Sequence, residues 1–359
     1  MIISIICFIL ILGTIVLVHE FGHFFFAKLF GIYVYEFSIG MGPKIFSKKD
    51  KKGETSYSIR AIPVGGFVQL AGEGLDEDSK LPKDRLLQSK PIWQRFLVMF
   101  FGAGNNFILA IVVLFFLGLI VGSPNNSTVI PSVIEGSPAY TAGLQAGDKV
   151  TSINGDRTKT LDDLQLYLTI AQGETSIEVL RDKERKTFVV TPLAGEEAEK
   201  AGYSYGITFD SELQHGFVNA VKYAFTKTWA LIRQLVITLK ELLPGGNVGL
   251  NDLSGPLGIY QAVDQTKSSG ISNLFYLLAL LCINVGFINL IPFPAFDGGR
   301  ILFLLIEKIK GSPIKPETEN LIHNIGFICL LVLILVVTFF DVFRMIGFDI
   351  IKFFSNIFK

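Results

Sequence analysis

The sequence predicts a polytopic α-helical membrane protein with about four transmembrane helices, a β-rich segment after the first helix and an inserted soluble α+β module. Half of the 359 residues are hydrophobic, and the mean hydropathy is +0.49. Charged residues are concentrated between long apolar stretches. Four of these stretches reach the length of about 20 mostly apolar residues that a helix needs to cross a bilayer.

Composition also excludes some functions. The formal net charge is +0, so the charge balance predicts no nucleic-acid partner and no acidic substrate. The three cysteines, Cys7, Cys282 and Cys329, lie in apolar stretches and form no CxxC pair. A disulfide framework and a cysteine-based zinc site are therefore not expected.

The four predicted transmembrane segments are 1–30, 96–122, 271–300 and 321–345. The first segment could instead be a cleaved signal peptide. However, it has no basic residues before the apolar run, the run is too long, and no small-x-small cleavage site follows it. We therefore expect it to stay in the mature protein.

Basic residues predict the orientation of the segments. Lys and Arg are abundant at 31–95 and recur between the third and fourth segments. Because such loops usually face the cytoplasm, the N-terminus, the central region and the C-terminus are expected outside.

The segment 31–95 is expected to be β-rich and to lie on the cytoplasmic side. Ser-Ile-Gly-Met-Gly-Pro at 38–43 and Pro-Val-Gly-Gly at 63–66 are typical of turns, and residues 55–59 alternate like a strand. Extended backbone near a bilayer must be buried in protein or line a wet cavity. A β-hairpin dipping toward a membrane site and a plain cytoplasmic loop both satisfy this condition.

The central residues 125–195 predict the soluble module. Strands are expected at 129–134, 149–153, 176–180 and 186–191, with a helix at 161–171 and a hairpin turn at Asn154-Gly155-Asp156. Residues 196–270 are expected to form an amphipathic helical region. Trp229 and nearby lysines indicate a helix that lies on the membrane surface or packs against the module.

The strongest chemical motif is His19-Glu20-Phe21-Gly22-His23, an H-E-x-x-H sequence inside the first transmembrane segment. On a helix, positions i and i+4 share one face, so both imidazoles can reach one metal ion with the glutamate beside it. Zinc accepts such ligands, acidifies a water molecule and works with a carboxylate base. An ionisable side chain this deep costs at least about 2.5–3.5 kcal/mol, so three of them predict function rather than packing.

A catalytic zinc site needs a third protein ligand. Asp297 is the best candidate, because two prolines at 292 and 294 break the helix just before it and freed backbone can line a cavity. His215 and His323 are placed poorly for this role. Asp297 could equally be the N-cap of a helix over 300–308, and both roles could hold together.

Several motifs in one order give a resemblance to the site-2 protease family of intramembrane zinc proteases, in its bacterial branch with an inserted PDZ domain, which includes the regulator of sigma-E protease. The resemblance covers nearly the whole chain. It rests on 19–23, on Phe37-Ser-Ile-Gly-Met-Gly-Pro-Lys, on 57–68, on Asn106-Phe-Ile-Leu-Ala, on Ser254-Gly-Pro-Leu-Gly-Ile, and on Asn-x-x-Pro-x-Pro at 289–294 before Asp297-Gly-Gly.

The resemblance implies that His19, His23 and Asp297 bind one Zn²⁺ per chain, that Glu20 is the general base and that Asn289 contacts the substrate backbone. It implies membrane-associated β-hairpins at 33–70 that present a substrate strand. It also implies a PDZ-like domain that carries Gly136-Ser-Pro-Ala and Ala142-Gly-Leu-Gln-Ala-Gly-Asp and screens substrates outside the cell. The chain departs from the family at Phe296, usually Leu, and at Ala103, usually Pro.

The expected function is therefore regulated intramembrane proteolysis by a multi-pass enzyme of the bacterial plasma membrane. Single-span membrane proteins in the lipid bilayer are the expected substrates, and the resemblance suggests anti-sigma factors and remnant signal peptides. Two rivals are a prenyl-protein endopeptidase, whose third ligand is a Glu, and a non-catalytic receptor that uses its PDZ-like module. Neither is favoured, because the motif lies deep in the first segment and all four catalytic groups are present.

Overall fold

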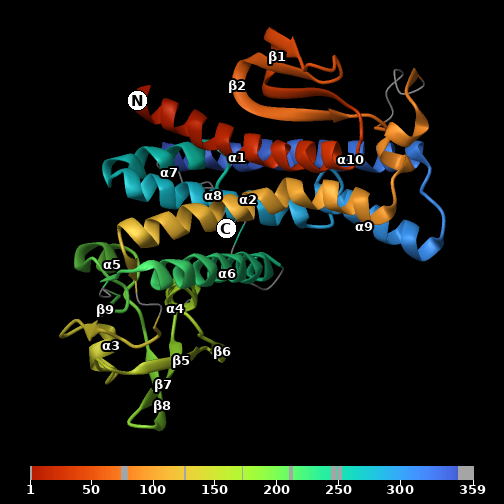
Figure 1. Ribbon diagram of the computed structural model, residues 1–359. Coiled ribbons are helices and arrows are strands. Elements are labelled where there is room, and N and C mark those ends of the chain that lie inside the picture. The colour runs from red at the N-terminus through yellow and green to blue at the C-terminus, as the bar shows by residue number, and fades with distance from the viewer. Residues whose placement is uncertain are drawn as a thin grey trace, which may run out of the picture. The chain divides into compact units, whose positions relative to one another are not determined.

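A computed structural model describes residues 2–73, 80–124, 127–171, 173–209, 213–243, 249 and 253–346. Within this part of the chain, four helices are long and apolar enough to cross a membrane. The prediction of a polytopic helical protein is therefore confirmed. The four are α1 (Ile2–Leu29), α2 (Ile92–Ile120), α8 (Ile271–Leu290) and α10 (Pro316–Met345) (Figure 1).

The chain forms two compact units. The first combines Met1–Val113 with Asn251–Lys359, and the second is Leu114–Leu250. The second transmembrane helix begins at Ile92 rather than at residue 96. The third ends at Leu290 rather than at residue 300, because the prolines at 292 and 294 cannot continue it and a new helix, α9 (Asp297–Lys310), starts after them.

Helix α1 is apolar almost throughout, and its helical hydrogen bonds satisfy the backbone groups within the segment, as a bilayer requires. It ends at Leu29 and is followed by Gly31, whose φ of +71° is readily adopted only by a residue without Cβ. The Gly31 N–H bonds to the Lys28 carbonyl, and the Ile32 N–H bonds to that of Ala27. This tight stop sends the chain directly into the β-sheet.

Two long strands, β1 (Val34–Lys49) and β2 (Ser56–Leu70), pair in a sheet with shifts of register. Residues 36–39 of β1 have partners on both sides, at 66–69 and at 56–59, whereas 44–49 pair with 56–60. The sheet lies beside α1 (Figure 1), with which β2 makes the more extensive contact. Among the described residues, 66–69 therefore form an edge next to the first helix.

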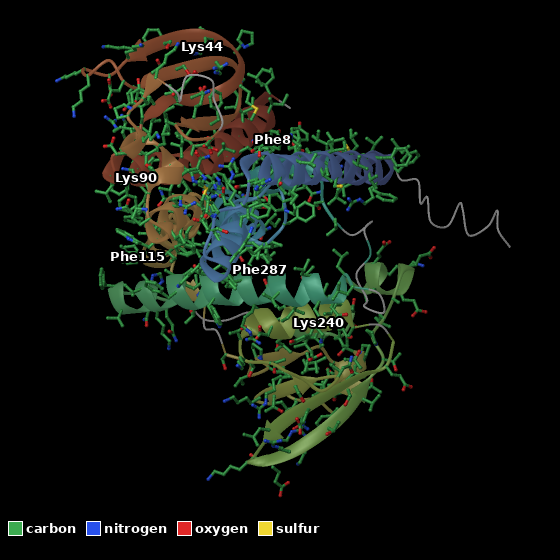
Figure 2. All side chains as sticks on the ribbon, turned by 90° about the vertical axis from the view of Figure 1, so that its right-hand side faces the viewer. Phe8, Lys44, Lys90, Phe115, Lys240 and Phe287 are labelled. Atoms are coloured by element: carbon green, nitrogen blue, oxygen red, sulfur yellow. The ribbon has the colours of Figure 1, made fainter. Side chains whose placement is uncertain are left out.

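A buried carboxylate fixes this irregular sheet. Glu36 on β1 receives bonds from Arg60 and Ser58 on β2 and pairs with Lys44 at 2.7 Å. Figure 2 labels Lys44 among the side chains of the sheet. Burial acts to raise the pKa of Glu36, but the hydrogen bonds from Lys44, Ser58 and Arg60 hold it below its usual value. The ionised carboxylate thus ties the two strands together.

The rest of the first unit packs around α1. Two short 3₁₀ helices, η2 (Lys83–Arg85) and η3 (Leu87–Ser89), lead into α2. A hydrophobic core joins the end of α1, the sheet, η3 and the start of α2; it contains Ala27, Ile32, Val34, Leu70, Leu87, Val98 and Met99. Helix α7 (Pro256–Ser268) precedes α8 and contacts α1, α8 and α10.

The second unit contains a four-stranded antiparallel sheet in the order β6-β5-β7-β8. Asn154 and Gly155, both with positive φ, make the predicted tight turn between β5 and β6. The strands are β5 (Lys149–Ile153), β6 (Asp156–Arg157), β7 (Thr175–Arg181) and β8 (Glu184–Val190). Smaller pairs are β3 (Ser123–Pro124) with β10 (Leu213–Gln214), and β4 (Ser132–Val133) with β9 (Ile207–Thr208).

The second unit also contains three shorter helices, and one of them, α4, packs on β5 and on the long helix α6 (Phe217–Glu241). Lys227 and Gln234 of α6 bond to Asp162, and Arg233 bonds to Asp163 at 2.7 Å. The amphipathic helix therefore packs against the module, one of the two placements that the sequence left open. The shorter helices are α3 (Pro138–Thr141), α4 (Leu161–Ile170) and α5 (Glu196–Ala201).

The expected strand at 129–134 is represented only by a bridge at Val129 and by β4. The amphipathic helical region was expected over 196–270, but the described part of it also contains α5, β9, β10 and α7 besides its long helix α6. The helix begins at Phe217, and residues 211 and 212 lie outside the described part of the chain, as do 125, 126 and 172 of the expected module.

Candidate metal centre

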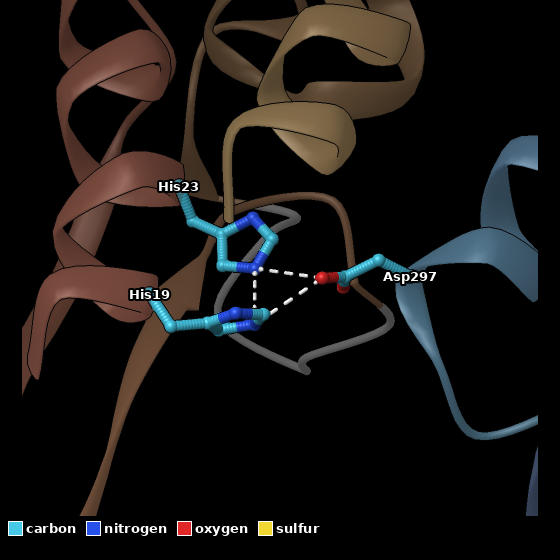
Figure 3. A group of neighbouring side chains, drawn as sticks. All are labelled: His19, His23 and Asp297. Atoms are coloured by element: carbon cyan, nitrogen blue, oxygen red, sulfur yellow. Dashed lines mark hydrogen bonds and ion pairs between the residues drawn. The ribbon is translucent and has the colours of Figure 1, made fainter. Parts of the chain in front are cut away.

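Two histidines of α1, His19 and His23, meet Asp297, which lies far along the sequence, inside the first unit (Figure 3). Asp297 Oδ2 lies 3.2 Å from His19 Nε2 and 3.4 Å from His23 Nε2, and the two Nε2 atoms are 3.2 Å apart. The side chains of His19, His23 and Asp297 are 12%, 11% and 14% exposed, respectively. They form a group with the spacing of metal ligands among the described residues.

The geometry of this triangle fits zinc. In a tetrahedral site with ligands at about 2.0–2.1 Å, neighbouring ligand atoms are roughly 3.3–3.4 Å apart. Moreover, Asp297 Oδ2 is buried and has no hydrogen-bond partner among the described residues. A buried carboxylate oxygen without a donor is costly, so a cation shared with two imidazoles would resolve the arrangement.

Helix α2 sets the orientation of His23. The His23 Nδ1 atom lies 2.8 Å from the Val98 carbonyl oxygen, which can only accept a hydrogen bond. Nδ1 therefore carries the proton, and the Nε2 lone pair is directed at the other two ligands. The ring lies on Gly102, where any side-chain carbon would overlap it.

A second glycine brings the two helices together. A Cβ atom at Gly22 would overlap the backbone of Phe101, so α1 and α2 touch through their main chains beside the histidines. Phe26 of α1 stacks on Phe101 with ring centroids 4.1 Å apart. This close crossing allows the Val98 carbonyl to reach His23.

Asn106, also on α2, is fully buried beside His19. Its Nδ2 lies 3.5 Å from His19 Nδ1, and its Oδ1 has no hydrogen-bond partner among the described residues. A histidine that binds a metal through one ring nitrogen usually has a hydrogen-bond partner at the other nitrogen. The Asn106 amide lies at this position beside His19 Nδ1.

Asp297 is the first residue of α9, and the chain reaches it through the loop 291–296. The alternative role as an N-cap is not seen: Phe296 occupies that position, and no side chain caps this helix. Gly298 and Gly299 lie so close to the carbonyls of Ile291 and Phe293 that the loop folds directly over the start of α9. The carboxylate is thereby turned toward α1.

Glu20 lies between the two histidines in sequence and interacts electrostatically with both of them and with Asp297. Strand β2 passes beside it: a Cβ atom built at Gly66 would lie 3.8 Å from Glu20 Cγ, and the backbone of Val68 interacts with its carboxylate. The carboxylate is therefore beside the ligand triangle without belonging to it.

The other predicted residues lie outside the triangle. Asn289, in the last turn of α8, donates a hydrogen bond to the Val285 carbonyl at 2.9 Å. His323, which the sequence placed poorly for a ligand, accepts a bond from the Ala295 N–H. Sequence reasoning gave no supporting role to Val98, Gly102 or Asn106, although Asn106 opens one motif of the family resemblance and small residues run over 102–104.

Comparisons with known proteins agree with this geometry. The model of peptidase family M50 matches residues 7–333. The chain is 35% identical to the regulator of sigma-W protease RasP of Bacillus subtilis, with 95% of this chain and 99% of the relative covered. It is 35% identical to the zinc metalloprotease RasP of Bacillus licheniformis, with the same coverage, and 31% identical to that of Oceanobacillus iheyensis, with 95% and 99% covered.

The family match spans most of the chain, and the relatives are covered almost from end to end. The four apolar helices and the family together make this a multi-pass bacterial membrane protein. The chain belongs to peptidase family M50, the site-2 protease family, and is a zinc metalloprotease of the kind that carries out intramembrane proteolysis.

Proposed function

We propose that this enzyme hydrolyses peptide bonds within or next to transmembrane segments of other membrane proteins, with one zinc ion held by His19, His23 and Asp297. The observation that carries the proposal is the triangle of ligand atoms at 3.2–3.4 Å, in which two histidines of the apolar helix α1 meet Asp297 of α9. When bound, zinc acts as a Lewis acid toward the scissile carbonyl and toward water.

Glu20 acts as the general base. Its carboxylate, beside the triangle, takes a proton from the attacking water and returns it to the departing amine. Strand β2 passes close to Glu20 at Gly66, and the Val68 backbone interacts with the carboxylate. A base held in this way needs little reorganisation when the proton moves.

The second nitrogen of His19 needs an acceptor once Nε2 is a ligand, because Nδ1 then carries the proton. A half-turn of the Asn106 amide offers its otherwise unpartnered Oδ1 at this position. Asn106 would then hold the ring of His19 as the Val98 carbonyl holds that of His23.

The substrate would bind as an extended strand. An α-helix hides its carbonyls in hydrogen bonds, so a transmembrane substrate must unwind before cleavage. Residues 66–69 form an edge of the β1–β2 sheet next to Glu20, and this edge offers backbone groups to a substrate strand. Asn289 would contact the substrate backbone near the scissile bond.

The second unit would be a PDZ-like domain on the extracytoplasmic side that screens substrates, with the β1–β2 sheet associated with the membrane from the cytoplasmic side. Single-span proteins are the proposed substrates. Anti-sigma factors are favoured because a relative is named as a regulator of sigma-W protease; remnant signal peptides are a second class.

The test compares cleavage of a model single-span membrane protein by wild type and Glu20→Gln, with zinc measured in both. We expect about one zinc per chain in each, and a rate lower by about 10²–10⁴ in the variant, the usual contribution of a general base. A variant that cleaves as fast as wild type, or a wild-type protein without zinc, would favour a non-catalytic receptor instead.

A further inference from the structure

The loop that delivers the third ligand has a strained backbone. Between the end of α8 and Asp297 the chain runs through residues 291–296, and Ala295 has a φ of +82°. An alanine rarely adopts this left-handed conformation, because its Cβ crowds the following carbonyl. Such a residue keeps its conformation only where its surroundings hold it. Ala295 lies two residues before Asp297, so the contacts that hold Ala295 also act on the position of this ligand.

Helix α10 provides the contact. The Ala295 N–H donates a hydrogen bond to His323 Nδ1 at 3.0 Å. One turn further on, Gly326 touches the loop: a Cβ atom there would lie 2.7 Å from the Pro294 carbonyl oxygen and overlap the proline ring. Because i and i+3 share a helix face, His323 and Gly326 form one surface against residues 294 and 295.

The hydrogen bond also fixes the state of the imidazole. A backbone N–H can only donate, so Nδ1 must be unprotonated and the ring hydrogen must be on Nε2. Nε2 is buried and has no hydrogen-bond partner among the described residues. The ring of Phe303 lies against the imidazole with centroids 5.4 Å apart. His323 Nδ1 therefore bonds to Ala295 while Nε2 stays without a partner among the described residues. Because its Nδ1 lone pair is used in this way, His323 is not available as a metal ligand.

We propose that His323 is a positioning residue for the metal site: its Nδ1, supported by Gly326, holds Ala295 in the conformation that turns Asp297 toward His19 and His23. This inference rests on the proposed ligand role of Asp297. Helix α10 contributes no residue to the ligand triangle, but under this proposal its contacts with Ala295 affect the affinity of the site for zinc.

The experiment measures the zinc dissociation constant of the full-length protein in detergent by competition with a chelator. His323→Leu keeps much of the volume but removes the acceptor, and we expect weaker binding by about 10–100-fold. His323→Asn places an amide oxygen near the position of Nδ1, and we expect a constant within about threefold of wild type. Asn324→Leu, an adjacent change on α10, is the control and should bind zinc as wild type does.

A second pair of variants tests the role of the strain. Ala295→Gly makes the left-handed conformation easy, so adding it to His323→Leu should recover part of the lost affinity. The d–d spectrum of the cobalt-substituted protein should change in His323→Leu and return toward wild type in His323→Asn, which a general loss of stability would not produce.

The outcomes separate this inference from the proposed function. If wild type binds no zinc, the proposed function fails. If wild type binds zinc and His323→Leu binds it equally well, or if His323→Asn is as weak as His323→Leu, the role of His323 is wrong. A double variant no better than His323→Leu would contradict the role of strain at Ala295.

Discussion

Buried carboxylates occur in both units of the molecule, but their surroundings differ. In the second unit, Asp163 Oδ2 accepts bonds from the Lys159 and Thr160 backbone N–H groups and from Arg233. In the first unit, Asp297 Oδ2 faces only two imidazole nitrogens at 3.2 and 3.4 Å and has no hydrogen-bond donor among the described residues.

The difference separates structural from functional charge. A carboxylate oxygen that receives several donors stabilises the fold, as Asp163 Oδ2 does with its three donors and by closing the capping box of α4 with Thr160, although Asp163 Oδ1 has no partner among the described residues. A carboxylate that meets two nitrogen lone pairs is satisfied only when a cation joins them. The comparison therefore predicts opposite results when the two kinds of acid are removed.

The largest effect is expected for Asp297→Ala. Loss of one of three protein ligands should reduce the zinc content from about one to near zero per chain and abolish cleavage. Asp163→Ala, the matched change in the second unit, should leave zinc content unchanged. Metal analysis of both purified proteins checks this. A zinc content of about one per chain in Asp297→Ala, or the loss of zinc from Asp163→Ala, would contradict the distinction between the two carboxylates.

Gly102→Ala should have the next largest effect, because its methyl group would overlap the His23 ring and displace a ligand. We expect zinc binding to weaken at least tenfold, in the range seen when partners of ligands are lost. Gly13→Ala is the control on α1, since a Cβ atom there meets only Pro63 O at an ordinary 3.8 Å. Chelator competition should separate the two variants, and equal zinc affinity would argue against this packing.

Asp148→Asn tests a structural acid. Its carboxylate pairs with Arg181 at 2.6 and 2.7 Å and is 1% exposed. Breaking this pair should destabilise the second unit by roughly 2–3 kcal/mol. Hydrogen exchange of β5 and β7 amides in the full-length protein measures the loss. The zinc affinity of Asp148→Asn should equal that of wild type. If the zinc affinity fell together with the protection of the β5 and β7 amides, structural and metal-binding carboxylates would not be separate classes.

The same pair gives a pH dependence. Burial acts to raise the pKa of Asp148, but Arg181 and the Gln145 N–H lower it below its ordinary value. The stabilisation is therefore complete above the ordinary pKa of an aspartate and is lost as pH falls through the folded value. Wild type should lose protection of β5 and β7 on acidification, whereas Asp148→Asn should respond less.

Asn106→Leu should have a smaller effect on zinc, because it removes a partner of His19 and leaves the ligand itself. We expect about tenfold weaker binding, whereas Asn106→Asp, which keeps an acceptor, should stay closer to wild type. Equal zinc affinity in wild type and Asn106→Leu would show that His19 needs no such partner.

The sequence predicted the four apolar helices and the H-E-x-x-H face well, because both depend on local periodicity and on the cost of polar groups in lipid. Asp297 required more, since a loop broken by two prolines brings it to α1 from far along the chain. Its resemblance to a family motif identified it, whereas spacing alone left the N-cap role open.

The supporting groups could not be predicted in this way. The Val98 carbonyl acts through the backbone, and Gly102 acts through the side chain it lacks, so neither has a chemical pattern to recognise. The double pairing of residues 36–39 also depends on register shifts that no alternation of residues specifies. His323 was judged only as a ligand, and its contact with Ala295 depends on a strained loop.

The most direct test of the central claim is X-ray absorption at the zinc edge of the purified, zinc-loaded protein. The account predicts two imidazole nitrogens and carboxylate oxygen at about 2.0–2.2 Å, with no sulfur. The Asp297→Ala protein should give no such spectrum. A zinc ion bound by sulfur at about 2.3 Å, or one whose spectrum is the same without Asp297, would contradict the assignment of His19, His23 and Asp297 as the ligands.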